Sequence, residues 1–204
     1  MKNSKMKRVL LVMLLQIVGV SIIKAQQSSE GASENKSEYA VEIDPATFFF
    51  NGYGVHLRFK PKKSNHLLLG LGAYAMDMPD FLVNMNSQNK DKGWQVRINQ
   101  GMGLFGEYYF QQVNQKWFIG TQLGLQEYKI ENEFEEGATA TYTNLLMMGY
   151  GGYSWQPFDA GLYVKPWMGV GYSPMISGNN EVGTQKYGVA PFTSFMTLHV
   201  GYKF

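Results

Sequence analysis

Hydrophobic and polar residues alternate with a period of two along most of the chain after residue 36, and turn-forming clusters separate the alternating stretches. The clearest stretch, Tyr53–Lys60, opposes the set Tyr53, Val55, Leu57 and Phe59 to the set Gly54, His56, Arg58 and Lys60. Comparable stretches cover residues 66–76, 94–110, 117–130, 162–172 and 196–204, while the facing of residues 142–155 is ambiguous. The pattern predicts an all-β protein whose strands have two unlike faces.

The two faces differ in a way that indicates a bilayer. One carries bulky apolar residues, and the other carries Gly, Gln, Asn, His, Arg and Lys. Glycine is a poor choice for a solvated outer surface but fits a crowded concave interior. In residues 94–110 the even-numbered residues, Trp94, Val96 and Ile98 among them, are predicted to face outward. Several stretches reach 11 residues or more, enough to cross a bilayer at a tilt. An apolar exterior around a polar interior is typical of a transmembrane β-barrel.

The lengths of the connections predict the strand number. Short connections fall at residues 61–65, 111–116 and 156–160, and long ones at 77–93, 131–141 and 173–191. A first strand over residues 37–44, followed by a tight loop at 44–47, brings the number of strands to eight. The remaining short connections then all lie at the same end of the barrel. We therefore expect residues 37–204 to form a single eight-stranded antiparallel up-and-down transmembrane β-barrel.

The N-terminus indicates export. Basic residues at positions 2, 5, 7 and 8 precede an apolar run over residues 9–23, and Lys24, Ala25 and Gln26 follow it. This layout predicts a signal peptide, residues 1–25, cleaved after Ala25. A retained anchor is the alternative, but a run of about 15 residues is shorter than the roughly 20 of a spanning helix. Residues 26–36 are small and polar, and predict a disordered arm.

Composition narrows the function classes. The net charge is +2 with scattered basic residues, which argues against nucleic acid as a partner. The chain has no Cys, so disulfides, thiol chemistry and a lipoprotein anchor are excluded. Aromatic residues make up 15% of the chain and gather at the ends of the stretches, as in the girdles of membrane barrels.

The last strand carries a resemblance. Leu198, Val200, Tyr202 and Phe204 place apolar residues at alternating positions up to a terminal Phe. With the leader and the alternating strands, this resembles the small Gram-negative outer-membrane β-barrels of the OmpA, OmpX and OmpW type. The resemblance implies location in the cell outer membrane, with lipid and lipopolysaccharide around the barrel. It also implies that the barrel-assembly machinery reads the strand ending in Phe204.

A cluster of inward-facing polar residues is the candidate site. Arg58, Glu107, Lys165, His56 and His199 are expected in the lower half of the lumen, with Glu42, Asp44 and Arg97 higher up. The first interpretation is a set of paired ions that cross-link the wall, with Glu107 beside Arg58 or Lys165. The second is a pocket for a small anion or an acyl carboxylate, for which the inward glycines leave room.

The third interpretation is catalysis, with His56 or His199 as a base that Glu107 orients. Some barrels of this size modify lipid A, but no Ser stands beside either His, and Thr197 is the nearest hydroxyl. The three histidines, at positions 56, 66 and 199, have no metal-ligand spacing, and no cofactor is expected.

The leading functional hypothesis is a non-enzymatic outer-membrane barrel with a role in structure, surface interaction or passage of a small solute. The alternatives are a lipid-modifying enzyme of the outer leaflet and a soluble lipocalin-like carrier. Two outer loops add to the picture: residues 77–83 are apolar enough to cover the barrel mouth or touch a partner, and residues 131–136 predict a soluble acidic loop.

Overall fold

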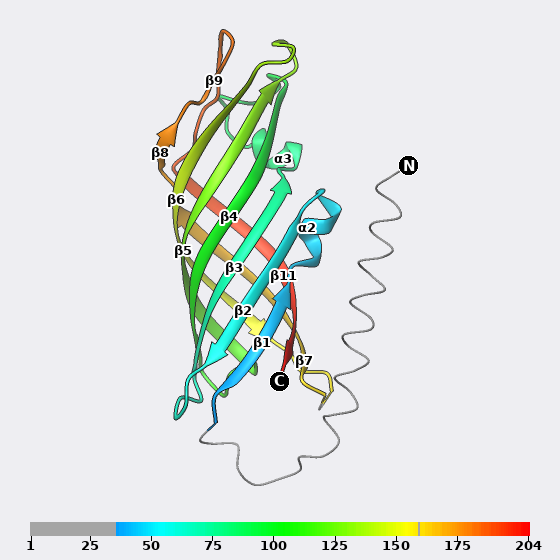
Figure 1. Cartoon of the computed structure of the whole chain (residues 1–204), viewed down its shortest axis with the longest axis vertical. Coiled ribbons are helices and arrows are strands. Elements are labelled where there is room, and N and C mark those ends of the chain that lie inside the picture. The colour runs from blue at the N-terminus through cyan, green and yellow to red at the C-terminus, as the bar shows by residue number, and fades with distance from the viewer. Residues whose placement is uncertain (1–35, 159) are drawn as a thin grey trace. The chain divides into compact units, whose positions relative to one another are not determined.

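The computed structural model describes residues 36–158 and 160–204. The expected signal peptide, and the expected arm up to residue 35, lie outside the described residues. Eight strands of the described residues make the barrel (Figure 1): β1 (Glu38–Ile43), β2 (Tyr53–Lys60), β3 (Leu67–Asp77), β4 (Trp94–Tyr109), β5 (Lys116–Asn132), β6 (Thr139–Ser154), β7 (Leu162–Tyr172) and β11 (Phe192–Lys203).

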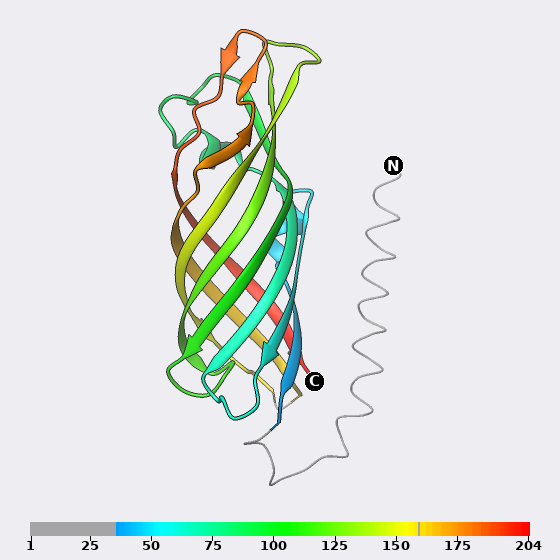
Figure 2. The ribbon, with the colours of Figure 1, turned by 60° about the vertical axis from the view of Figure 1, so that its left-hand side comes forward.

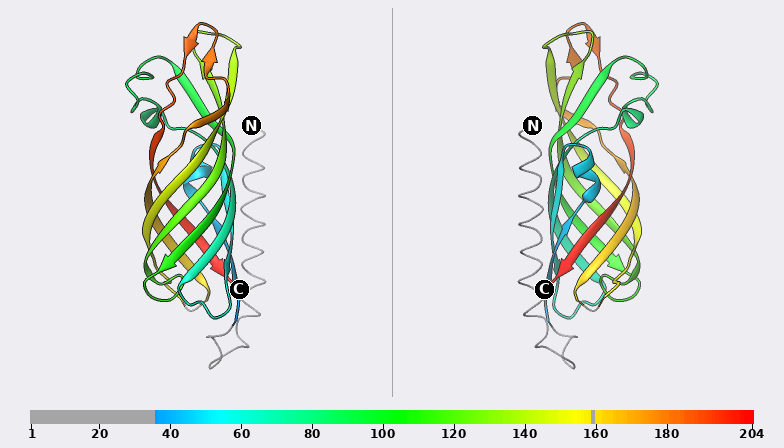
Figure 3. Two further views of the ribbon diagram at one scale, coloured as in Figure 1. Left: turned by 90° about the vertical axis from the view of Figure 1, so that its left-hand side faces the viewer. Right: turned by 90° about the vertical axis from the view of Figure 1, so that its right-hand side faces the viewer.

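The strands pair antiparallel with their neighbours, and the ring closes where β1 meets β11, from Ala40 opposite Lys203 to Ile43 opposite Val200. The strands are tilted relative to the barrel axis and together form its wall, as two further orientations show (Figures 2 and 3). The prediction of eight antiparallel strands in an up-and-down barrel is therefore confirmed. The last outer connection adds β8 (Met175–Gly178), which pairs with β6, and the small hairpin of β9 (Glu181–Val182) and β10 (Gln185–Lys186).

The first connection is longer than the predicted tight loop. It contains a helical turn, α2 (Pro45–Phe49), which Asp44 caps by accepting a hydrogen bond from Ala46 N. Proline at the first helical position and a capping Asp are common signals of a helix start, and the prediction overlooked them. A second short helix, α3 (Asp80–Val83), lies in the long connection after β3. Within the described residues, no helix has the length and hydropathy that crossing a membrane requires.

The barrel is apolar outside and charged inside. Leu104 and Val170 are 64% and 69% exposed, whereas Arg58 and Lys165 are at most 2% exposed. The bulky outward faces predicted for β2, β5, β7 and β11 are all found, and β6 turns its even-numbered residues inward. Only a hydrocarbon environment favours such a surface, because in water it would expose a continuous apolar belt. The arrangement is the reverse of a soluble carrier with an apolar interior.

Strand β4 corrects the predicted facing. Its register against β5 shifts between Ile98 and Gln100, which is the signature of a β-bulge. The extra residue reverses the alternation, so Trp94, Val96 and Ile98 point inward and are 5–6% exposed, whereas Met102 points outward at 62%. The prediction that all even-numbered residues of this strand face lipid is therefore wrong above the bulge. Strand β3 also shifts register, between Tyr74 and Met76. Alternation within residues 66–76 predicts Ala75 on the outward face of Leu69 and Leu71, but Ala75 is buried.

The outer surface changes character at the height of the β4 bulge. On β5 the outward series changes from Leu125 to Glu127, and on β6 it changes from Leu145 to Thr143, which is the partner of Glu127. Beyond this row the outward residues of β5 and β6 are polar, and a buried cluster around Trp94, Ile130, Tyr142, Val182 and Tyr187 fills the interior. The row marks the edge of the apolar belt, so β4, β5 and β6 continue beyond the membrane with inverted polarity. The tip of the hairpin that joins β5 to β6 covers residues 133–138 and is shorter than the predicted loop at 131–141.

Candidate functional site

Glu42 is the hub of the charged cluster inside the barrel. One of its oxygens, Oε1, accepts from Lys165 Nζ at 2.6 Å and from the Tyr163 hydroxyl at 2.8 Å. The other, Oε2, accepts from Arg58 Nε at 2.8 Å and lies 3.0 Å from His199 Nδ1. The expectation that Glu42 lies above the cluster is wrong, because the register of β1 places it opposite His56 of β2.

Glu107 on β4 is the second anion of the cluster. Both of its oxygens lie 3.0 Å from Lys165 Nζ, and Oε1 lies 3.4 Å from Arg58 Nη2. The hydroxyls of Tyr109 and Tyr150 donate to Glu107 at 2.9 and 3.0 Å. Glu107 was predicted to pair with Arg58 or Lys165; it contacts both, and the tyrosines complete its hydrogen bonds.

The cluster balances two carboxylates against two cations. Glu42, Arg58, Glu107 and Lys165 come from β1, β2, β4 and β7, and each is at most 2% exposed. Buried charges are tolerated only when they are paired and hydrogen-bonded, and here each one contacts partners on other strands. Arg58 also lies over the ring of Phe105, with its Cζ 4.6 Å from the ring centroid. The network thus crosses the lumen and joins distant parts of the wall.

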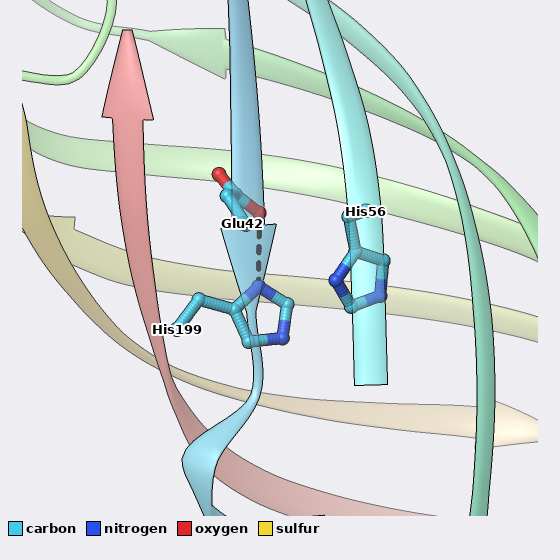
Figure 4. Close-up of side chains that lie close together, drawn as sticks. All are labelled: Glu42, His56 and His199. Carbon is cyan, nitrogen blue, oxygen red and sulfur yellow. Dashed lines mark hydrogen bonds and ion pairs between the residues drawn. The ribbon is translucent and has the colours of Figure 1, made fainter. Parts of the chain in front are cut away.

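Two histidines, His56 and His199, lie beside Glu42 of this network (Figure 4). The rings of His56 and His199 are stacked, with centroids 4.6 Å apart and planes inclined by 23°. Glu42, not Glu107, contacts His199, so the predicted orienting role of Glu107 toward a histidine base is not found. Thr197, the hydroxyl residue nearest to His199 in the sequence, donates from Oγ1 to Asp44 Oδ1 at 2.8 Å.

A cavity of about 80 Å³ lies next to the histidines, on the side toward the outer loops. Its polar lining includes His56, His199, Asp44, Tyr74, Gln122 and Gln126, and apolar side chains cover much of the rest. Since one ordered water needs about 10–15 Å³ of such volume, the space holds a few waters or one very small ligand.

All five residues predicted for the lumen cluster lie together, and Arg97 does not join them. Arg97 points to the outside of the barrel, where it pairs with Asp77. Sequence reasoning overlooked the tyrosines at positions 109, 150 and 163. Alternation could have identified two of them. Tyr109 follows Glu107 by two residues and Tyr163 precedes Lys165 by two residues, so each tyrosine shares the inward face of its neighbour.

Comparisons with known proteins give a likeness of fold. No protein-family model and no curated protein matches the chain. The N-terminal β-barrel domain of Pseudomonas aeruginosa OprF is 14% identical, with 84% of this chain and 98% of that one covered and a TM-score of 0.42. A major outer membrane protein from Thermus thermophilus is also 14% identical, with 83% and 100% covered and a TM-score of 0.48.

Likenesses at this level add no argument about activity. What decides the class of this chain is its own architecture, which combines a closed ring of eight strands, an apolar belt outside and a charged, hydrogen-bonded interior. On these grounds the chain is a membrane-spanning β-barrel of the outer-membrane type.

Proposed function

We propose that this protein is a closed, non-conducting scaffold of the outer membrane that holds its outer loops at the cell surface. The observation that carries the proposal is the ion network across the lumen, in which Glu42, Arg58, Glu107 and Lys165 leave almost no surface accessible to water. An eight-stranded barrel is just wide enough for its interior to be filled by side chains. Moving an ion through this section would require separating buried ion pairs.

The packing around the network supports the same proposal. The side chains of Tyr109 and Tyr163 are fully buried, and Phe118 is 2% exposed. Tyr109 stacks on Phe118 with ring centroids 5.1 Å apart, toward the end of the barrel with the short connections. The cavity of about 80 Å³ lies on the other side of the network, so it does not extend into a channel through this packed section.

The order in the outer loops supports a role in surface interaction. Asn89 exchanges two hydrogen bonds with the backbone of Gly188, at 2.7 and 2.9 Å, which ties the connection after β3 to the last connection. Phe81, Met85 and Phe134 are 66–69% exposed in these loops. Large apolar side chains on ordered loops are suited to a protein or lipid partner.

Conductance across a planar lipid bilayer tests the closed state. We expect no resolved conductance steps from the wild type, because the network leaves no continuous water path. The charge-balanced double variant Lys165→Ala with Glu107→Ala removes two side chains from the centre of the network and is expected to conduct. The matched control, Lys129→Ala with Glu131→Ala, removes an ion pair at the outside of the barrel and should stay silent. Steady conductance of the wild type would refute the closed scaffold.

We also propose the outer membrane as the location, lipid and lipopolysaccharide as the surroundings, and the barrel-assembly machinery as a partner of the last strand. Support comes from the outward series of β11, in which Met196 and Leu198 are exposed and the rings of Tyr202 and Phe204 pack edge to face at 5.3 Å.

A further inference from the structure

His56 is a buried imidazole with one nitrogen that lacks a hydrogen-bond partner in the described part of the chain. It is 4% exposed, and its Nδ1 has no partner among the described residues. In Figure 4 this nitrogen points toward Glu42 and His199 rather than toward the strand wall. Burying a polar atom without a hydrogen-bond partner destabilises the folded protein. Because this nitrogen is directed toward other polar groups, we infer that a ligand lies between them.

The surrounding groups lie near enough to become the ligands of one small cation once the His56 ring turns out of its stack on His199. One ligand atom each from Glu42, His56 and His199 can be chosen such that all three lie within 4.8 Å of one another. Glu42 Oε2 and His199 Nδ1 are 3.0 Å apart. That separation is close to the one between adjacent ligands that each lie about 2.1 Å from a metal. The cavity beside His56 leaves its ring room to approach.

The charge of the region favours a cation. Asp44 is 4% exposed, and its Oδ2 lies 4.0 Å from His199 Nε2. With Asp44 added to Glu42 and Glu107, three carboxylates face the two cations Arg58 and Lys165. Over these five groups one buried negative charge is left over, and a metal cation bound between Glu42 and the histidines compensates it.

We propose that Glu42, His56 and His199 form a binding site for one divalent transition-metal ion. On binding, His199 coordinates the metal through Nδ1 as the neutral tautomer that carries its proton on Nε2, so its hydrogen bond to Glu42 is replaced by bonds from both residues to the metal. Two imidazole nitrogens with one carboxylate oxygen suit Zn²⁺, Cu²⁺ or Ni²⁺. Ca²⁺ and Mg²⁺ are not expected to bind, because they require a shell made mostly of oxygen ligands.

Titration of the untagged protein, purified in detergent micelles, tests the site with Zn²⁺ as the probe. Calorimetry should report one Zn²⁺ per chain, and both His56→Gln and His199→Gln should weaken binding by tenfold or more. The matched control is His66→Gln, because His66 lies at the opposite, short-turn end of the barrel and bonds to Tyr109 O at 2.9 Å. That variant should bind Zn²⁺ like the wild type.

Electron paramagnetic resonance of bound Cu²⁺ gives a second measurement, with splitting from two nitrogens expected in the wild type and from one nitrogen in His56→Gln. Circular dichroism of each variant shows whether the barrel is folded. If the wild type binds no Zn²⁺ at 1 mM, or if folded His56→Gln and His199→Gln bind it unchanged, the site does not exist and the space beside His56 holds water. Neither result affects the conductance test, so the two proposals stand or fall separately.

Discussion

The charged network makes a strong prediction for Lys165→Met. Lys165 Nζ lies 2.6 Å from Glu42 and 3.0 Å from both oxygens of Glu107, so this one ammonium serves both carboxylates. Methionine keeps an unbranched side chain of similar volume beside Phe118 but removes the charge. The variant leaves two buried carboxylates facing the single guanidinium of Arg58.

The expected cost follows from the imbalance of buried charge. Removing one partner of a buried ion pair typically costs about 3–5 kcal/mol, because the remaining charge has lost its compensation. The comparable surface change, Lys129→Met, removes a contact at 2.6 Å to Glu131 between side chains that are 40% and 44% exposed. Water screens that pair, so its loss should cost less than about 1 kcal/mol.

Urea-induced unfolding in lipid vesicles, followed by the fluorescence of the four tryptophans, measures the difference. With a denaturant slope of about 2 kcal/mol per M, the midpoint of Lys165→Met should fall by about 1.5–2.5 M. The further change Glu107→Gln restores charge balance, so the double variant should recover part of this loss. If Lys165→Met unfolds within about 0.5 M of the wild type, or the second change adds a further full loss, our account of the network is wrong.

Two further predictions concern the barrel wall and the outer loops. A Cβ on Gly72 would lie 2.0 Å from His56 Cδ2, whereas one on Gly149 meets nothing within 4 Å. Gly72→Ala should therefore lower the unfolding midpoint in urea, and the control Gly149→Ala should not. Equal midpoints of the two variants would contradict the close packing around Gly72. In the loops, the hydroxyl and backbone N–H of Thr184 both donate to Glu135 and hold the pKa of that carboxyl below its usual value. This contact stabilises the loop above the usual pKa and is lost as the pH falls through the lowered one. Thr184→Val should therefore raise the pKa of Glu135 in a carboxyl-carbon NMR titration, and an unchanged value would argue against the contact.

The sequence predicted most of the barrel because one physical rule governs most of it. Each strand must turn apolar groups to lipid and polar groups to the lumen, so apolar and polar residues alternate along it. Leu57, Leu123 and Val170 occupy the apolar, outward positions of this alternation on three different strands. The rule fails where another environment begins. Trp94 and Val96 continue the same parity, yet they lie inside, because the bulge near Gln100 leaves no mark in the hydrophobic pattern.

The members of the site were easier to predict than their contacts. Inward parity identified His56, Arg58 and Lys165, because charged residues of a membrane barrel must avoid lipid. Heights inside the barrel depend on strand tilt and register, which no single strand encodes. That is why Glu42 was expected too high and Glu107 was assigned to a histidine that Glu42 contacts instead. The unpartnered nitrogen of His56 is likewise a property of packing that alternation does not predict.

The bulge in β4 has a consequence for assembly. One added residue allows a continuous strand to pass from the bilayer into water. Its apolar groups point outward within the bilayer and inward in the water beyond it. The outer end of the β5–β6 hairpin, which includes Lys129 and Glu131 of β5 and the tip residue Glu133, must therefore be carried through hydrocarbon before it can reach that water. Each of these charges resists the passage. The final shape of the hairpin is stable only after translocation, so the largest barrier to insertion should lie in the delivery of this tip rather than in the closure of the ring.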